Sequence, residues 1–276
     1  MKFVRSQSNK SAVCRILRIS RSVVYYKSKR CRDALTKAVL KVFVKHNSNY
    51  GSRRIRAELK DEGIVVSKTR IIKILKENGK EPKYGRRKLA RNIHSNKDER
   101  YIAENLILGK RATHKGQICH TDFTEFQYQG GKLYVSGIID ALDRTAVIKW
   151  GDRQTKELVK ENIESLTYVP QILHSDRGPQ YTSNLIREYA IENNIQRSMS
   201  APFCSCQNAM IETFWKTLKV EIGETKYFTK EELIKVLEYQ VHYYNNERRH
   251  SSLNYLSPVR YATLYGASPI QCSAPA

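Results

Sequence analysis

The stretch QICHTDFTEFQYQGGKLYVSGIIDALDRTAVIKW, residues 117–150 of a chain of 276, decides the fold. It holds three runs rich in β-branched and aromatic residues, which favour strands, at 117–126, 133–140 and 145–150. The Gly130-Gly131 pair between the first two runs is typical of a tight hairpin turn. Three antiparallel strands are therefore expected to open this part of the chain.

Helical and strand patterns alternate after residue 150. Helices are expected over 156–166 and 184–193, strands over 171–175 and 196–199, and a further helix from Ala209. Antiparallel strands followed by alternating helix and strand predict an α/β fold, a mixed five-stranded sheet flanked by helices.

Three acidic residues stand at informative places in this pattern. Asp122 and Asp176 close short β-like runs, and Glu212 lies on the helix that starts at Ala209. The 35 residues between Asp176 and Glu212 leave room for a helix, a strand and a loop, so one edge of the sheet can collect all three carboxylates. Mg²⁺ prefers oxygen ligands, and two such ions can clamp the attacking and leaving oxygens of a phosphodiester displacement.

The helix that carries Glu212 has two distinct stripes. The apolar stripe consists of Ile211, Phe214, Trp215, Leu218 and Ile222. Glu212, Lys216 and Lys219 follow the neighbouring stripe at i, i+4 and i+7. Because the apolar stripe must pack on the sheet, Glu212 is expected at the rim, with the two lysines beside it.

Longer motifs surround these residues. They are SDRGPQYTS at 175–183, Asn208-Ala209 ahead of Glu212, and YNNERRHSSL at 244–253 with Ser257-Pro258 after it. Together they resemble the OrfB, or integrase-core, transposases of the bacterial insertion-sequence-three family, which are DDE enzymes similar to retroviral integrases. The resemblance covers residues 11–261, nearly the whole chain, and is far more selective than any one short motif.

The resemblance implies a ribonuclease-H-like fold and a DNA transposase. Asp122, Asp176 and Glu212 would be both the catalytic residues and the ligands of Mg²⁺, with Mn²⁺ able to substitute. The implied reaction is metal-dependent strand cleavage at the insertion-sequence ends, followed by attack of the freed 3′-hydroxyl on a second phosphodiester.

Charge divides the chain sharply. Residues 1–118 contain 32 Lys and Arg against 9 Asp and Glu, whereas residues 119–276 contain 17 against 18, within an overall net charge of +22. A one-sided excess of this kind favours double-stranded DNA as partner over mere solubility. The expected organisation is a basic helix-turn-helix-like region over 1–80, a basic linker over 81–116, a catalytic core over 117–265 and a disordered tail over 266–276.

The basic region is expected to be helical. Residues 11–30 form a small helix-turn-helix candidate, residues 34–46 an amphipathic helix, and Ser67 is placed to cap a helix over 68–78. The buried stripe of that last helix is expected to consist of Ile71, Ile72, Ile74 and Leu75. Its basic side, with Lys68, Arg70, Lys73 and Lys76, suits the major groove, although a solvated helix face is the plainer alternative.

Candidate DNA contacts also lie outside that helix. They are Arg53 and Arg54 in the family's linker motif, and Arg177 beside Asp176. The resemblance to retroviral integrases also implies that Lys216 and Lys219, beside Glu212, contact DNA phosphates. Four other acidic residues are given structural roles: Asp140 at a strand end, and Glu125, Asp143 and Asp152 at the surface or in turns.

The cysteines do not predict a metal site. All six are scattered without a Cys-x-x-Cys pair, so no structural zinc is expected, and Cys119 and His120 are interpreted as packed strand residues. With no signal peptide and no apolar run near 20 residues, the chain is expected in the bacterial cytoplasm, associated with the nucleoid and not with a membrane.

Two departures bear on activity and partners. The loop at 203–207 lacks the glycine and the acidic residue usual in the family ahead of Asn208. No heptad run is present, so an OrfA-type partner or fusion is expected alongside a homo-oligomer on DNA. Two alternatives remain: an idle DNA-binding regulator or inhibitor of transposition, and, ranked last, a ribonuclease H or Holliday-junction nuclease.

Overall fold

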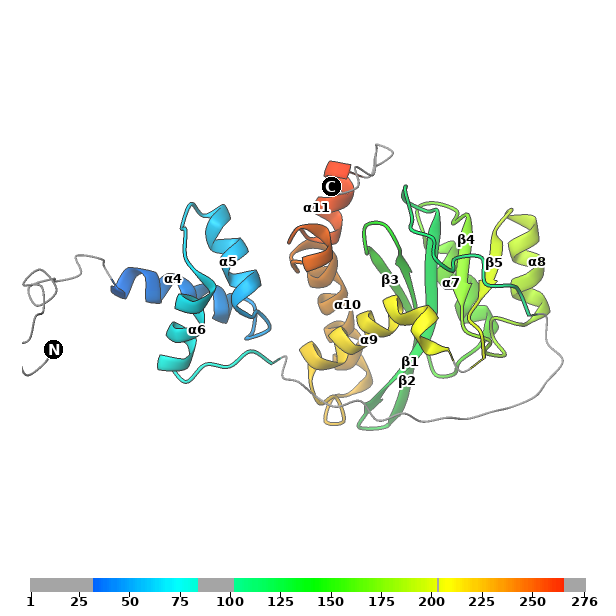
Figure 1. The fold of residues 1–276 in the computed structure, drawn as a ribbon. Helices are drawn as coiled ribbons and strands as arrows, with labels where there is room; N and C mark the ends of the chain where they lie inside the picture. Colours follow the sequence, from blue (N-terminus) through cyan, green and yellow to red (C-terminus); the bar gives the residue numbers. More distant parts are fainter. Residues whose placement is uncertain (1–31, 84–101, 203, 266–276) are drawn as a thin grey trace, which may run out of the picture.

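The computed structural model describes residues 32–83, 102–202 and 204–265 (Figure 1). Three helices come first: α4 (Arg32–Lys45), α5 (Ser52–Asp61) and α6 (Lys68–Glu77). A sheet with its covering helices follows. The helix-turn-helix candidate at 11–30 and the expected tail at 266–276 lie outside the described residues.

The sheet has five strands in the order β3-β2-β1-β4-β5. Their bounds are β1 (Ile118–Tyr128), β2 (Gly131–Asp140), β3 (Ala146–Gly151), β4 (Ile172–Ser175) and β5 (Gln196–Met199). The first three strands are antiparallel neighbours, whereas β4 lies parallel to β1 and β5 lies parallel to β4. The predicted mixed five-stranded sheet is confirmed.

Helices cover both faces of this sheet (Figure 1). On one face α7 (Lys156–Glu164) and α8 (Asn184–Glu192) pack with Ile138 of β2 and Leu173 of β4. On the other, α9 (Ala209–Ile222) and α10 (Lys230–Asn246) pack with Val135 and Ile139 of β2. Side chains of β2 alternate between the two cores because successive residues of a strand point to opposite faces. The last helix of the described residues is α11 (Pro258–Tyr265), and short 3₁₀ turns lie at Ser205–Asn208 and Ser251–Leu253.

Local signals set the starts of several helices. Ser67, Thr155, Ser183 and Thr229 each accept a hydrogen bond from a backbone N–H of the first turn that they precede. The predicted cap at Ser67 is confirmed, with its hydroxyl 3.3 Å from the Arg70 nitrogen.

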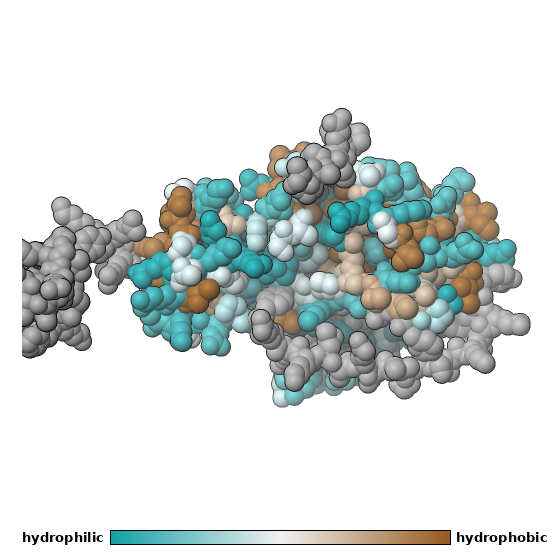
Figure 2. All heavy atoms as spheres, viewed as in Figure 1, coloured by the Kyte–Doolittle hydropathy of each residue, from teal (hydrophilic) through white to brown (hydrophobic). Residues whose placement is uncertain are grey.

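One residue of the predicted α6 stripe is misplaced. Ile71, Ile74 and Leu75 are buried as expected, but Ile72 is 53% exposed. It lies one step further around the helix, and a three-helix group is too small to cover more than one face of α6. Figure 2 shows such exposed hydrophobic residues as separate brown areas among hydrophilic teal on this part of the molecule.

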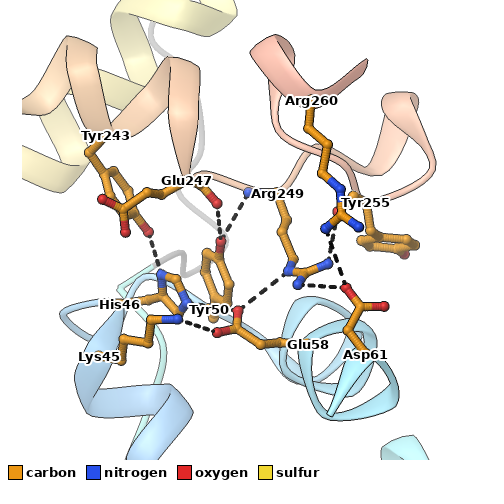
Figure 3. Close-up of polar contacts among 10 residues, drawn as sticks. All are labelled: Lys45, His46, Tyr50, Glu58, Asp61, Tyr243, Glu247, Arg249, Tyr255 and Arg260. Atoms are coloured by element: carbon orange, nitrogen blue, oxygen red, sulfur yellow. Dashed lines mark hydrogen bonds and ion pairs between the residues drawn. The ribbon is translucent and has the colours of Figure 1, made fainter. Parts of the chain in front are cut away.

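The N-terminal helices dock against the end of α10 and the turn after it through a buried polar cluster (Figure 3). Glu58 of α5 is at its centre, 5% exposed. Its carboxylate accepts hydrogen bonds from Lys45 Nζ at 2.9 Å, His46 Nε2 at 2.8 Å and Arg249 Nε at 3.3 Å. Across the interface the Tyr243 hydroxyl lies 2.8 Å from His46 Nδ1. We call these five residues the Glu58 cluster.

The electrostatics of the Glu58 cluster favour a charged carboxylate. Burial alone would raise the pKa of Glu58, but the hydrogen bonds from His46 and Lys45 outweigh it and lower the pKa to about 2. Nearby, the Tyr50 hydroxyl accepts from the Arg249 backbone nitrogen at 2.9 Å. Residues nearly 200 positions apart in the sequence are thus joined by satisfied buried groups.

Residues 102–116, within the region expected to be a linker, follow the surface of the core. The Leu106 backbone nitrogen donates to Ser198 Oγ of β5 at 2.9 Å. The Gly116 nitrogen donates to Asp140 Oδ2 at 2.7 Å. Asp140, 1% exposed, therefore has the structural role expected of it.

Asp143 corrects the sequence interpretation. It was expected at the surface or in a turn, and it does lie in the turn between β2 and β3, but it is fully buried. Its carboxylate accepts from Thr145 Oγ1 at 2.6 Å and pairs with Lys115 Nζ at 3.0 Å. A cation from the segment before β1 thus permits the burial, and no local pattern reveals such a partner.

Candidate active site

Asp122 and Asp176 lie on adjacent parallel strands. The register of β1 and β4 pairs His120 with His174, so two residues further on Asp122 stands beside Asp176, directly after the last residue of β4. Neighbouring strands are about 4.8 Å apart. The two carboxylates therefore lie side by side where β4 ends, and Asp176 follows its strand as the sequence predicted. The prediction that Asp122 closes a β-like run is wrong, because β1 stays paired with β2 as far as Tyr128.

Glu212 lies above these two carboxylates, in the first turn of α9. Ile211, Phe214 and Leu218 are buried against β1–β3, and Glu212 is exposed. Trp215 packs on the sheet where β2 offers Gly137, the residue paired with Asp122. A Cβ on Gly137 would lie 2.4 Å from the Trp215 ring, so only glycine admits the indole here.

The site is dominated by uncompensated negative charge. Burial, then the charge of Asp176 and that of Glu212, raise the pKa of Asp122 to about 7. Among the residues that the structure describes, none of these three carboxylates takes part in an ion pair, whereas Glu58 and Asp143 do. Asp176 is steadied by its own turn, since Oδ1 accepts from the Gly178 nitrogen at 2.9 Å.

Buried neutral groups support the strands beneath the carboxylates. His174 bridges two serines of the β5 end, with Nδ1 2.8 Å from Ser198 Oγ and Nε2 3.0 Å from Ser200 Oγ. His120 lies edge-on to it at 5.3 Å between ring centroids. Burial lowers the pKa of each histidine to about 4, so both are neutral near pH 7. His120 and Cys119 are packed strand residues, as predicted.

The donor set suits hard divalent cations, which prefer carboxylate oxygens. In the described part of the chain, no three His, Cys, Asp or Glu side chains are grouped closely enough to hold a metal as they stand. Asp122 and Asp176 start from adjacent strands and Glu212 from an exposed helix turn, so side-chain rotation would have to draw the three together. Their mutual repulsion is the physical reason why a cation would favour that movement.

Comparisons with known proteins show which family has this sequence and fold. The family described as Integrase core domain matches residues 112–205 and, in a second form, residues 193–258, and an HTH-like domain matches 30–88. The chain is 31% identical to the 31 kDa protein of insertion element IS600 from Shigella sonnei, covering 92% of this chain and 98% of that one. It is 30% identical to the transposase for insertion sequence element IS904 from Lactococcus lactis, covering 82% and 92%. The chain belongs to the integrase-core transposases of the insertion-sequence-three family.

Further similarities agree with this membership. Transposase InsF for insertion sequence IS3A from Escherichia coli is 29% identical, over 91% of this chain and 92% of that one. The intasome of simian T-cell lymphotropic virus includes a chain with the same fold, with a TM-score of 0.50 and 16% identity, covering 87% of this chain and 77% of that one. The fold is ribonuclease-H-like, and the protein is a DNA transposase, a polynucleotidyl transferase. The idle regulator is not favoured.

The transposase carries two lysines beside Glu212. Lys216 and Lys219 are exposed on the same stripe of α9, as predicted from helical spacing. The ammonium of Lys219 lies 5.6 Å from the Phe126 ring centroid. Partial burial lowers the pKa of Lys219, and the charges of Glu125 and Asp122 offset part of that effect. Lys219 is thus held near the carboxylates by its aromatic contact.

The other candidate DNA contacts differ in how exposed their side chains are. On α6 of the transposase, Lys68 and Lys73 are exposed and Arg70 is half-buried. On α5, Arg53 is exposed, whereas Arg54 lies over the Tyr50 ring at 5.7 Å.

Arg177 is engaged in the fold as well. Its Nε donates to the Ser200 carbonyl at 2.9 Å and so ties the residue after Asp176 to the loop that follows β5.

Among the described residues of the transposase, no helix has the length and apolar composition needed to cross a membrane.

Asp122→Asn is expected to stabilise the transposase in EDTA at pH 8 by about 1–3 kcal/mol, measured by urea unfolding. An acid whose pKa rises from 3.8 unfolded to about 7 folded keeps its proton longer in the folded state. Stability is therefore lost as pH rises from about 4 to about 7, and the amide removes that loss. The gain should shrink toward pH 5; an equal gain at both pH values would show that charge at Asp122 is not its cause.

Proposed function

We propose that the transposase cuts DNA at the ends of its element and joins the freed 3′-hydroxyl to target DNA with Mg²⁺ held by Asp122, Asp176 and Glu212. Integrase-core transposases are metal-dependent. The observation that carries the proposal is the position of Asp122 beside Asp176, below Glu212, with the pKa of Asp122 raised by burial and then by the charges of Asp176 and Glu212. A divalent cation at such a site supplies Lewis acidity and lowers the pKa of bound water.

The protein's own contribution is placement of oxygen ligands. Asp122 stands in the middle of a long paired strand and Asp176 is held by its turn, so both backbones are fixed. Glu212 approaches from a helix anchored by Ile211 and Phe214. Both chemical steps are in-line displacements at phosphorus, so one site can serve both, with no covalent protein–DNA intermediate.

Basic residues divide the remaining work in this proposal. Lys68, Arg70 and Lys73 would contact DNA through the HTH-like region, with Arg53, while Lys216 and Lys219 would hold the end that reacts. A homo-oligomer on DNA, an OrfA-type partner or fusion, and a nucleoid location in the cytoplasm complete it. A partner that supplies paired DNA-binding units suits a reaction on two element ends.

Cleavage of a labelled duplex that carries the element's own terminal repeat tests the proposal. We expect strand nicking at the repeat boundary with Mg²⁺ or Mn²⁺, and joined product when a target duplex is added. EDTA should abolish both because the carboxylates alone supply no electrophile. Ca²⁺ controls for DNA binding without chemistry, and undiminished nicking in EDTA would contradict the metal assignment.

Changing Lys68, Arg70 and Lys73 together to Ala should weaken DNA binding and lower the slope of log affinity against log salt by roughly 2–3. By contrast, Lys216→Ala with Lys219→Ala should lower that slope by roughly 1–2 and mainly reduce end joining. Fluorescence anisotropy at several salt concentrations and a joining assay measure the two effects.

The matched control for these lysine variants is Lys235→Ala, an exposed lysine on α10 that lies outside both groups. It should leave both readouts near the wild-type value. A triple α6 variant with the wild-type salt slope would show that this helix face is only solvated.

A further inference from the structure

Asn208 occupies the N-cap position of the helix that carries Glu212, yet its side chain does not cap that helix. An asparagine there ordinarily accepts a hydrogen bond from a backbone N–H of the first turn, which contributes about 1 kcal/mol to helix stability. In this chain the side chain turns away from α9 and is 3% exposed. A buried amide that forgoes its usual bond points to another task.

The amide of Asn208 bridges to β1. Its Oδ1 lies 2.9 Å from His120 Nδ1, and its Nδ2 donates to the Thr121 carbonyl at 3.1 Å. The reversed amide would set two carbonyl oxygens against each other at Thr121, so one orientation alone satisfies both contacts. The Thr121 carbonyl belongs to the peptide group that joins Thr121 to Asp122. Asn208 therefore ties the start of α9 to the backbone next to Asp122.

The strand that receives this tie is itself fixed. The Thr121 hydroxyl donates to the Gly137 carbonyl of β2 at 2.9 Å, and the His120 ring is edge-on to His174 on β4. Both neighbours of β1 thus hold the two residues that Asn208 contacts. A displacement of Asn208 would move the helix start and not the strand.

Glu212 lies four residues after Asn208, about one helical turn along the same face of α9. We infer that Asn208 is a positioning residue that sets the spacing between Glu212 and Asp122 by bonding to the backbone at Thr121 and to His120. The inference rests on the proposed metal-binding role of the three carboxylates. It gives the Asn208-Ala209 motif a physical role.

Two variants separate bridging from helix capping. Asn208→Ala removes the bridge and offers no cap in its place, whereas Asn208→Ser is too short to reach Thr121 and His120 but supplies a hydroxyl that can cap α9, a bond that Asn208 itself does not make. The readout is the rise in melting temperature as Mg²⁺ is added to the full chain without DNA. Asn208→Ser should melt within about 2 °C of wild type in EDTA but need roughly 10-fold more Mg²⁺ for half of the rise, since lost ligand support typically costs 10–100-fold.

Kinetics supply a second readout. Asn208→Ser should lower kcat for strand cleavage roughly 10-fold or more and leave the KM for DNA within about twofold, because it moves a metal ligand and no DNA contact. Asn193→Ala is the matched control, since Asn193 ends α8 with one bond to the Tyr189 carbonyl at 2.9 Å, away from the carboxylates. It should keep the wild-type Mg²⁺ response.

Glu212→Gln distinguishes a failure of the role inferred for Asn208 from a failure of the proposed metal site. If Glu212→Gln loses the Mg²⁺ response and Asn208→Ser keeps that of wild type, the role of Asn208 is overturned and the metal site stands. If Glu212→Gln responds to Mg²⁺ as wild type does, the proposed metal site itself falls, and the inference with it.

Discussion

Asp122→Asn, Asp176→Asn and Glu212→Gln should each lower the rate of strand cleavage by on the order of 10³-fold or more, while DNA affinity stays within about twofold. A metal acting on a phosphoryl oxygen contributes several kcal/mol to transition-state stabilisation, and each 1.4 kcal/mol is tenfold in rate. An amide keeps the shape of a carboxyl group but loses the charge that holds the ion. Single-turnover cleavage of a labelled terminal repeat with Mg²⁺ measures the effect.

Glu125→Gln is the matched control for these variants. It makes the same chemical change on the same strand as Asp122, three residues away, but Glu125 is exposed and pairs with Lys132 at 2.9 Å. Exposed ion pairs of this kind contribute about 0–1 kcal/mol to stability. Cleavage near the wild-type rate in any one of the three site variants would remove that residue from the catalytic set.

Glu58→Ala should destabilise the protein by about 3–5 kcal/mol, because the buried His46 loses its carboxylate partner and Lys45 and Arg249 each lose an ion pair, although Arg249 keeps Asp61 at 2.8 Å. Chemical unfolding followed by circular dichroism measures the loss. Glu62→Ala, an exposed residue at the end of the same helix, should change stability by no more than about 0.5 kcal/mol. A Glu58 variant as stable as wild type would show that the cluster contributes no net stabilisation.

The pH dependence of the Glu58 effect follows from its lowered pKa. Folding shifts this carboxyl from an ordinary pKa of 4.5 to about 2, so its stabilisation is present above about 4.5 and is lost as pH falls toward 2. The difference between Glu58→Gln and wild type should therefore be largest near neutral pH and shrink in acid.

Many features of the secondary structure and of side-chain burial could be predicted from the sequence alone. Alternating apolar residues and the Gly130-Gly131 turn predicted β1 to β3, and the hydroxyl at Ser67 predicted the start of α6. Helical spacing predicted that Glu212 lies on the rim while Phe214 is buried. These features depend on residues a few positions apart, so the local sequence is enough to predict them.

Tertiary structure decided what depends on partners distant in the sequence. Ile72 is exposed because three helices cover only one face of α6, and Asp143 is buried because Lys115 reaches it from another segment. No sequence pattern near Glu58 predicts its hydrogen bond with Arg249, and none near Asn208 predicts its hydrogen bond with the Thr121 carbonyl.

The active site combines both kinds of information. The sequence predicted that Asp176 follows a strand and that Glu212 lies near the start of a helix, because strand and helix periods are local, whereas β1 continues beyond Asp122 to Tyr128. Only the insertion of β4 parallel to β1, with His120 beside His174, decided that Asp122 and Asp176 stand side by side. Register and docking arise from the packing of whole elements, so the sequence named the three acids, and the tertiary structure set Asp122 beside Asp176 with Glu212 above them.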